Sequence, residues 1–360
     1  NFDGVCEAIG NDHYVSVIDV YRQIPSKMTL GRLRSHLDDH DGRCYNMLSL
    51  EFTGTKLNDL VQYPSLVAEL SWSTQFFPFK LYKSARGYEK LKKSTFAQES
   101  SVPVEYLAEK KHLHLRPTVE MYCLASMEGS YTDFHIDFGG SSVWFHIYLG
   151  KKIFYVVEPT ERNLLIYEEW QKSPNQEVFI GDAFGEECYR VEVEEGNTLM
   201  IPSGWIHAVY TPSDSLIFCG SFLCFPSIIN QYKVNEIEMR THVEQNYQYP
   251  NFETSNWYAA RYMTKKLKDA DKKPDEFMMR SVEAMLKTHQ IWIDRDLARD
   301  KKKKTRQKGP NKLFIAKQSQ VDILNQLRTR FVRCEELVKQ TDADEEGEEN
   351  GPPSKRLRSE

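Results

Sequence analysis

Two short segments that lie far apart in the chain carry side chains suited to binding one metal ion. Residues 132–137 (TDFHID) contain His135 and Asp137, and residues 202–207 (PSGWIH) end on His207. Residues two apart on a β-strand project from the same side, so His135 and Asp137 can reach one ion, and the fold must bring His207 to them. Two imidazoles and one carboxylate are the ligand set of non-haem iron(II) oxygenases, which leaves three coordination positions open.

A His-x-Asp triplet is weak evidence by itself, because the chain has a second one at His36 and Asp38. Apolar residues at 30, 33 and 37 follow Thr29, a favourable N-cap, so we expect a helix on which His36 and Asp38 diverge. The segment around His135 is instead extended in character and ends in a Gly-Gly pair. A buried histidine bonded to an aspartate is the alternative there, and the distal histidine favours the metal site.

Runs of β-branched and aromatic residues predict a mainly β domain. The predicted strands are 14–20, 44–52, 119–127, 143–148, 153–158, 188–193, 198–201 and 215–225, with one helical interruption at 163–170. This number of strands suits a closed double sheet, and a small β-barrel with a metal at its mouth is the expected architecture. Beyond Phe225, apolar spacing predicts helices over 229–239, 257–267, 277–293 and 313–338.

The residues around the predicted ligands resemble the JmjC-domain histone lysine demethylases. The resemblance rests on 131–140 (YTDFHIDFGG), 142–144 (SVW) and 201–209 (IPSGWIHAV), and it extends to roughly residues 13–76 and 117–262. It is strongest to the branch that pairs the JmjC domain with a plant-homeodomain finger, and the F-box-linked branch is next. The resemblance implies a double-stranded β-helix (a jelly-roll or cupin-like JmjC barrel) followed by a C-terminal helical region.

The resemblance also implies Fe(II), 2-oxoglutarate as co-substrate and O2. It assigns the metal to His135, Asp137 and His207; 2-oxoglutarate to Thr132, Lys152 and Asn46; and the substrate pocket to Tyr122, Leu48, Ile206 and Ser221. Lys152 has an argument of its own, because one lysine of the pair 151–152 must face inward on a strand, and a buried ammonium needs an anion. The alternative is two solvated lysines at a strand end. For Leu48 and Ile206, packing alone is an equal alternative.

Two positions depart from the family pattern. Phe145 stands where relatives often have a tyrosine that helps bind 2-oxoglutarate, and Ser221 stands where they often have asparagine. Loss of one neutral hydrogen bond weakens binding by about 0.5–1.5 kcal/mol, so Phe145 predicts a raised co-substrate requirement and not inactivity. Ser221 changes the polar wall of the substrate pocket.

The chain begins at Asn1, so we expect a fragment of a longer protein. The expected organisation is strands and a helix leading into the barrel (1–76), an inserted basic loop region (77–118), the JmjC barrel (119–225), a helical domain (226–300), a basic linker with an amphipathic helix (301–340) and a disordered tail (341–360). Basic segments 80–93 and 301–308 are candidates for contact with nucleosomal DNA, and solvated loops are the alternative.

The seven cysteines include no Cys-x-x-Cys pair, which favours a reducing compartment and excludes a zinc finger in this segment. No apolar run approaches the roughly 18–20 residues that span a bilayer, and no signal peptide is present, so we expect a soluble intracellular protein without membrane contact. Residues 355–358 (KRLR) fit a nuclear import signal.

The predicted function is oxidative demethylation of mono- or dimethyl-lysine in the histone H3 tail, in the nucleus, with release of formaldehyde, succinate and CO2. The branch resemblance favours lysine 9 or lysine 27, and lysine 36 is the F-box-linked alternative. A protein hydroxylase of the same fold and a non-catalytic chromatin-binding module are the two other hypotheses.

Overall fold

The computed structural model describes residues 1–39, 42–75, 116–174, 178–268, 275–303 and 317–349. The chain divides into two compact units, residues 1–255 and 256–360. The predicted basic segment 80–93 and residues 304–308 of the second one lie outside the described residues.

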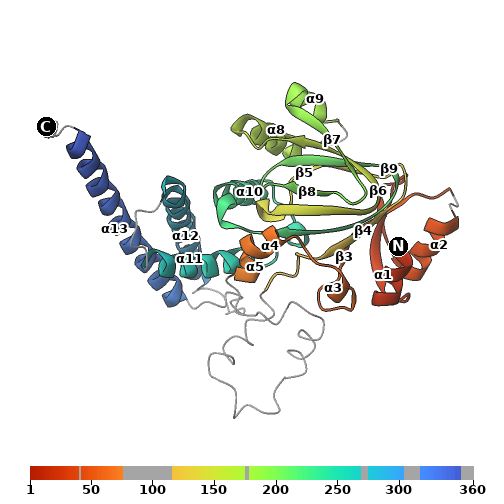
Figure 1. Cartoon of the computed structure of the whole chain (residues 1–360), viewed down its shortest axis with the longest axis horizontal. Coiled ribbons are helices and arrows are strands. Elements are labelled where there is room, and N and C mark those ends of the chain that lie inside the picture. Colours follow the sequence, from red (N-terminus) through yellow and green to blue (C-terminus); the bar gives the residue numbers. More distant parts are fainter. Residues whose placement is uncertain (40–41, 76–115, 175–177, 269–274, 304–316, 350–360) are drawn as a thin grey trace, which may run out of the picture. The chain divides into compact units, whose positions relative to one another are not determined.

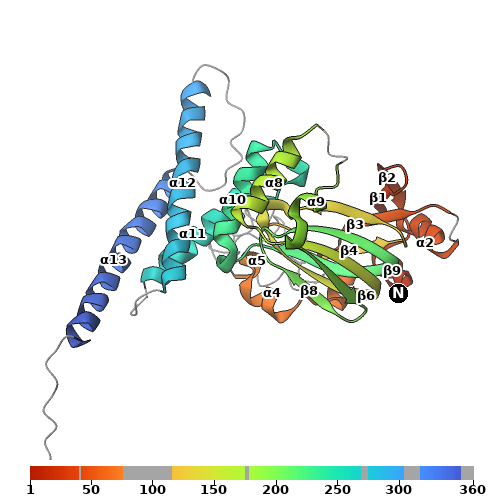
Figure 2. The ribbon, with the colours of Figure 1, turned by 90° about the horizontal axis from the view of Figure 1, so that it is seen from above.

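The first unit is built on a nine-stranded antiparallel sheet, which Figure 1 and Figure 2 show from two directions. Its strands are β1 (Tyr14–Asp19), β2 (Ile24–Thr29), β3 (Tyr45–Glu51), β4 (Tyr122–Ser126), β5 (Tyr131–His135), β6 (Ser142–Val157), β7 (Cys188–Glu194), β8 (Thr198–Ile201) and β9 (Ile206–Phe222). The order is β2-β1-β3-β4-β9-β6-β7, with β5 beside β9 and β8 beside β6. The predicted class, an antiparallel β-structure with helical additions, is confirmed, although helices account for more of the described residues than strands do.

The long strands β6 and β9 form the centre of the architecture. They pair along almost their whole length, from Ser142 opposite Phe222 to Val157 opposite Ile206. One half of this ribbon pairs with β8 and β4, and the other half with β7 and β5. The ribbon therefore belongs to two layers of strands: one layer contains β4 and β8, and the other contains β5 and β7.

Two strand predictions need correction. The predicted strands 143–148 and 153–158 are one strand, β6, because Gly150 has φ 80° and lets the chain bend without ending the ladder. A side chain at Gly150 would collide with the carbonyl oxygen of Asp214 on β9, so the two strands approach each other closely at this point. The predicted strand 215–225 begins earlier, at Ile206. Strand β2 was not predicted.

Three clusters of buried apolar residues lie on the two faces of the sheet. The inner cluster fills the space between the layers and consists of Val143, Phe145, Ile147, Phe154, Val156, Val193, Ile201, Ile217 and Cys219. A second cluster, on the other face, includes Phe134, Val157, Tyr167, Ile180, Phe184 and Ile206. The third packs β1, β3 and β4 against the N-terminal helices. The alternation of strand residues divides the apolar side chains between these clusters.

Helices cover the sheet of the first unit. They are α1 (Phe2–Ile9), α2 (Leu30–Asp39), α3 (Leu57–Leu60), α4 (Ser65–Leu70), α5 (Trp72–Gln75), α8 (Glu161–Lys172), α9 (Gly181–Phe184) and α10 (Ile228–Arg240). The helix predicted to follow Thr29 is confirmed as α2, and the Thr29 hydroxyl accepts the backbone N–H of Arg32 at 3.3 Å, as an N-cap does. His36 therefore lies on a helix, with its ring 4.9 Å from that of Tyr45.

The second unit is helical. It contains most of α11 (Phe252–Lys268), together with α12 (Glu276–Lys303) and α13 (Lys317–Glu349), and α12 packs against α13. His289 of α12 is buried, with its ring centroid 4.3 Å from Trp257 of α11 and 4.8 Å from Trp292. Helix α13 continues to Glu349, whereas the sequence predicts disorder from residue 341. Among the described residues, no helix combines the length and the apolar character needed to cross a membrane.

Candidate metal centre

His135, Asp137 and His207 come together in the first unit. One ligand atom from each lies within 4.8 Å of the others, and no other such group of three or more His, Cys, Asp or Glu occurs in the described part of the chain. His135 ends β5 and stands opposite His207 on β9, and the two ring centroids are 4.2 Å apart. Asp137 lies beyond the end of β5, with Oδ2 3.6 Å from His207 Nε2. The expectation that Asp137 lies on the same strand as His135 is therefore wrong, but its backbone is extended (φ −60°, ψ 142°), which preserves the two-residue relation.

Hydrogen bonds orient both imidazoles. His135 Nδ1 lies 2.8 Å from the carbonyl oxygen of Asp133, and His207 Nδ1 lies 3.1 Å from that of Trp205. A carbonyl oxygen only accepts, so each Nδ1 carries a hydrogen, and Nε2 is the nitrogen that the neutral form of each ring would offer to a metal. This is the arrangement in which metal-binding histidines are usually found.

The electrostatics of the three residues fit a cation. His207 Nε2 is fully buried and has no hydrogen-bond partner among the described residues. Burial, and then the neighbouring His135, lower the pKa of His207 well below its usual value, which keeps the ring neutral and able to bind a metal. Burial raises the pKa of Asp137 to about 6, and His135 opposes that rise. An orphaned imidazole nitrogen beside a desolvated carboxylate is the environment that a divalent ion would satisfy.

An irregularity in β5 determines which way Thr132 points. Thr132 is opposite Val209 and His135 is opposite His207. From one pair to the other, the chain advances by three residues on β5 but by two on β9, so β5 has one extra residue. Directly opposed residues share one face of a sheet, and the bulge therefore places Thr132 on the same face as the two histidines. Strict alternation would have placed Thr132 and His135 on opposite faces.

Lys152 is buried on the inner side of β6, with 3% of its surface exposed. Its ammonium donates to the Thr211 hydroxyl at 2.5 Å, and it forms no ion pair within the described residues. Burial lowers the pKa of Lys152 to about 7, and the Cys219 thiol nearby acts in the opposite direction. The adjacent Lys151 is half-exposed and pairs with Glu192, so one lysine of the pair faces inward and one outward, as alternation predicts. The sequence reasoning did not predict Thr211. This residue lies four positions after His207 on β9, so alternation places both side chains on the same face.

The other predicted pocket residues are distributed around the inner face. Asn46 of β3 is buried and its Oδ1 accepts the Ser126 hydroxyl at 2.8 Å across the strand pair. Tyr122 is half-buried and faces Glu51. Leu48 is half-buried and lies in the irregular part of β3, where the register shifts between Met47 and Leu50.

Ser221 and Phe145 line the same inner side. Ser221 is buried and opposite Val143, a member of the inner cluster. The ring of Phe145 is 6.3 Å from that of His207 and meets it edge-on. Both departures from the family pattern therefore lie on the face of the sheet that carries His207.

Of the two roles considered for Ile206, pocket wall and packing, the structure favours packing. Ile206 is fully buried and packs with Phe134, Val157 and Tyr167 in the cluster on the opposite face of the sheet. Because His207 faces the inner side, its neighbour on the strand must face outward, and the same alternation rule that paired His135 with Asp137 excludes Ile206 from the pocket.

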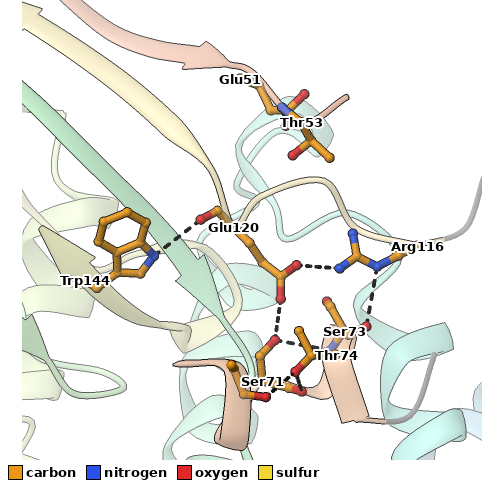
Figure 3. A network of polar contacts seen from close by, with 9 residues as sticks. Glu51, Thr53, Ser71, Ser73, Thr74, Arg116, Glu120 and Trp144 are labelled. Carbon is orange, nitrogen blue, oxygen red and sulfur yellow. Dashed lines mark hydrogen bonds and ion pairs between the residues drawn. The ribbon is translucent and has the colours of Figure 1, made fainter. Parts of the chain in front are cut away.

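A buried polar network fixes the segment that leads into β4 (Figure 3). Arg116 donates through Nη2 to Glu120 at 2.6 Å, and the Ser71 hydroxyl donates to the other carboxylate oxygen at 2.5 Å. The Glu120 carbonyl oxygen accepts the indole N–H of Trp144 at 3.3 Å. Gly220 lies so close to this carbonyl that any side chain there would overlap it. The network therefore anchors β4 just before Tyr122.

Comparison with known proteins identifies the domains around this site. Residues 122–222 match the family model described as "JmjC domain, hydroxylase", and residues 227–323 match the one described as "Jumonji helical domain". The fold and the site thus define a JmjC domain with its helical companion.

Curated relatives agree with that assignment. The chain is 36% identical over 294 residues to lysine-specific demethylase 7A of Danio rerio, which covers 80% of this chain and 30% of the relative. It is 37% identical over 293 residues to histone lysine demethylase PHF8 of Danio rerio (80% and 25%). It is 41% identical over 254 residues to lysine-specific demethylase 2B of Mus musculus (69% and 18%). The chain spans less than a third of the length of each of these three proteins. It belongs to the JmjC-domain family, in the group whose relatives are the plant-homeodomain-linked and F-box-linked lysine demethylases.

Proposed function

We propose that this domain is an Fe(II)- and 2-oxoglutarate-dependent oxygenase that demethylates mono- and dimethyl-lysine in the histone H3 tail. The observation that carries the proposal is the group of His135, Asp137 and His207, with both imidazole Nε2 atoms available and His207 Nε2 buried without a partner. The iron and its co-substrate, when bound, supply the dioxygen-dependent oxidation of a methyl C–H bond. The overall products are the demethylated lysine, formaldehyde, succinate and CO2.

In this proposal His135, Asp137 and His207 hold the iron. Lys152 holds the distal carboxylate of 2-oxoglutarate, because its buried ammonium has no anionic partner among the described residues. Thr132 shares the inner face with the histidines and is proposed as the second group that binds the co-substrate, with Asn46 at its side. The hydrocarbon surface of the inner cluster excludes water from the reacting groups.

Tyr122, Leu48 and Ser221 are the proposed walls of the methyl-lysine pocket. Tyr122 is paired with Glu51 across β3 and β4, and a cationic methylammonium in the pocket would be attracted to the ionised form of that carboxyl group, whose pKa is raised by burial. The relatives' names support a lysine substrate, and the branch resemblance extends the proposal to lysine 9 or lysine 27 of histone H3, with lysine 36 as the F-box-linked alternative. Action in the nucleus, on nucleosomes whose DNA contacts the basic segments 80–93 and 301–308, belongs to the same proposal.

The test is formaldehyde release, followed together with peptide mass, from dimethylated histone H3 tail peptides with Fe(II), ascorbate and 2-oxoglutarate. The wild type is compared with His207→Ala and with a control, His13→Ala, which changes an exposed histidine. We expect formaldehyde and loss of one methylene mass per methyl group in the wild type and the control, and neither in His207→Ala. A gain of one oxygen mass without formaldehyde would identify a hydroxylase, and bound metal without any mass change would indicate a binding module.

A further inference from the structure

Asp137 is the only one of the three proposed ligands that lies outside a strand. β5 ends at His135, and a short 3-10 turn, η4 (Phe138–Gly140), begins directly after Asp137. Gly139 and Gly140 both have positive φ (62° and 59°), which few residues other than glycine adopt. Ladder hydrogen bonds therefore do not fix this carboxylate, and contacts from elsewhere must set its position.

Helix α10 holds the turn from one side. The Glu238 carboxylate is buried and its Oε1 accepts the backbone N–H of Gly139 at 2.6 Å. A side chain at Gly139 would come within 2.7 Å of Tyr249 Cβ, and one at Gly140 within 2.9 Å of Val234 Cβ. Gly140 thus allows the close approach to α10, and Gly139 allows the close approach to Tyr249, which precedes α11 (Phe252–Lys268).

Helix α8 holds the same segment from the residue before Asp137. The backbone N–H of Ile136 interacts with the Tyr167 hydroxyl and acts against the burial that raises the pKa of this phenol to about 12. The same hydroxyl accepts Nε2 of Gln171 at 3.0 Å. Ile136 lies between the two ligands of this segment. Its backbone and that of Gly139 are therefore both bound, on either side of Asp137.

The two helices are tied to each other by a bidentate ion pair. Arg240 of α10 donates through Nε and Nη2 to the two carboxylate oxygens of Glu168 on α8, at 2.7 and 2.8 Å. The Arg240 guanidinium, with Lys172, lowers the pKa of Glu168 to about 2. Paired hydrogen bonds of this kind fix orientation as well as distance.

Helix α10 also reaches the turn that precedes His207. The Ser203 hydroxyl donates to the Gly140 carbonyl oxygen at 2.5 Å, and Asn230 of α10 donates to the Ser203 carbonyl oxygen at 3.4 Å. The Gly139–Gly140 turn is thereby linked to the loop from which β9 and His207 begin.

We infer that Glu238 and Tyr167 are positioning residues for the metal centre: they bind the backbone on either side of Asp137 and hold its carboxylate where the histidines can share an ion. The inference rests on the metal site of the proposed function. It assigns α10, the first helix of the Jumonji helical domain, a direct role in positioning a proposed metal ligand. Groups that orient metal ligands typically contribute 10–100-fold to metal affinity.

The experiment measures Co²⁺ binding, by calorimetry and by the visible d–d absorption of the bound ion, in Glu238→Leu, Glu238→Gln and the wild type. Glutamine keeps the oxygen that accepts from Gly139, whereas leucine removes it. Glu236→Leu is the matched control: it makes the same change on the same helix at a side chain that is 55% exposed, and it removes only a 3.6 Å contact to Nη1 of Arg240, whose Nε and Nη2 bind Glu168. We expect Co²⁺ to bind about 10–100-fold more weakly to Glu238→Leu with an altered spectrum, and within roughly threefold of wild type to Glu238→Gln and Glu236→Leu.

Tyr167→Phe provides an independent variant, since it removes one oxygen and leaves the packing of the ring unchanged. If Glu238→Leu does not fold, Tyr167→Phe, with its thermal midpoint measured in parallel, decides the question: weaker Co²⁺ binding in a folded protein supports the inference. Wild-type affinity and spectrum in the folded variants would overturn it. Absence of Co²⁺ binding to the wild type would overturn both this inference and the proposed metal site. Metal binding with the expected pattern but no formaldehyde would overturn only the proposed reaction.

Discussion

Binding of 2-oxoglutarate should be linked to protonation of Lys152. In the free protein, burial lowers the pKa of this lysine from 10.5 to about 7. A bound carboxylate would give the ammonium an anionic partner in a desolvated place and would raise the pKa again. Binding above pH 7 must therefore take up a proton from solution.

The number of protons taken up on binding follows from the pKa of Lys152. At pH 8 about nine-tenths of Lys152 is neutral in the free protein, so we expect uptake of about 0.9 proton per 2-oxoglutarate, and of only about 0.1 at pH 6. Affinity should fall about tenfold for each pH unit above 7, which is about 1.4 kcal/mol per unit.

The same group has the opposite effect on the stability of the free protein. Between the folded pKa near 7 and the unfolded value of 10.5, the unfolded chain binds a proton that the folded chain does not. The contribution of Lys152 to the free energy of unfolding therefore rises as the pH rises from 7 to 10.5, by on the order of 5 kcal/mol in total. Lys152→Met removes this dependence, and Lys151→Met, at the exposed neighbour, keeps it.

The assay is calorimetric titration of 2-oxoglutarate into Mn²⁺-bound protein at pH 6 and pH 8, in two buffers that differ in ionisation enthalpy. Proton uptake makes the observed enthalpy at pH 8 depend on the buffer. Identical enthalpies in both buffers at pH 8, together with tight binding, would refute the argument, because Lys152 would then already be charged before the co-substrate binds.

Three further predictions concern the surroundings of the site. Glu120→Leu leaves Arg116 buried without its carboxylate and should lower the free energy of unfolding by about 3–5 kcal/mol in denaturant titrations; a change below about 1 kcal/mol would show that the network contributes little. Phe145→Tyr should lower the KM for 2-oxoglutarate severalfold, by the hydrogen bond of about 0.5–1.5 kcal/mol that this chain lacks, and an unchanged KM would contradict this. Thr211→Val removes the hydroxyl that accepts from Lys152, so the pH above which 2-oxoglutarate binding weakens should fall. Thr132→Val should weaken 2-oxoglutarate binding without moving that pH. Equal pH profiles of binding for the two variants would count against separate roles of the two threonines.

Alternation along a strand and apolar spacing along a helix predicted the direction of side chains whose direction depends on a single element. Alternation predicted that one lysine of the pair 151–152 faces inward, the resemblance selected Lys152, and the structure buries it. The helical spacing after Thr29 predicted that His36 and Asp38 diverge, and α2 is the helix there. Alternation, applied to the residue before His207, would have excluded Ile206 from the pocket. The sequence reasoning left the pocket and packing as equal alternatives for Ile206, and the geometry of the strand would have favoured packing.

Other features depended on contacts that no local pattern encodes. The inward direction of Thr132 comes from a bulge that exists only in the pairing of β5 with β9. Thr211 becomes the partner of Lys152 through the register of β6 against β9. Glu238 and Tyr167 reach the Asp137 segment from helices that follow it in the chain, and a glutamate or tyrosine on an amphipathic helix does not reveal such a contact.

The pairing of β6 with β9 also sets the distance between the two ends of the proposed site. On β9, His207 and Thr211 face the inner side four residues apart, and Val156 and Lys152 repeat this spacing on β6, so the two ends are about 13 Å apart along the strands. The lysine side chain occupies part of that length, and the remainder suits a small dicarboxylate that reaches from the ammonium to the metal. A slip of one residue between β6 and β9 would change the spacing between Lys152 and His207, whereas the pairing of β5 with β9 keeps His207 opposite His135. Two registers therefore meet on β9: one assembles the proposed metal ligands, and the other sets the room left for the proposed co-substrate.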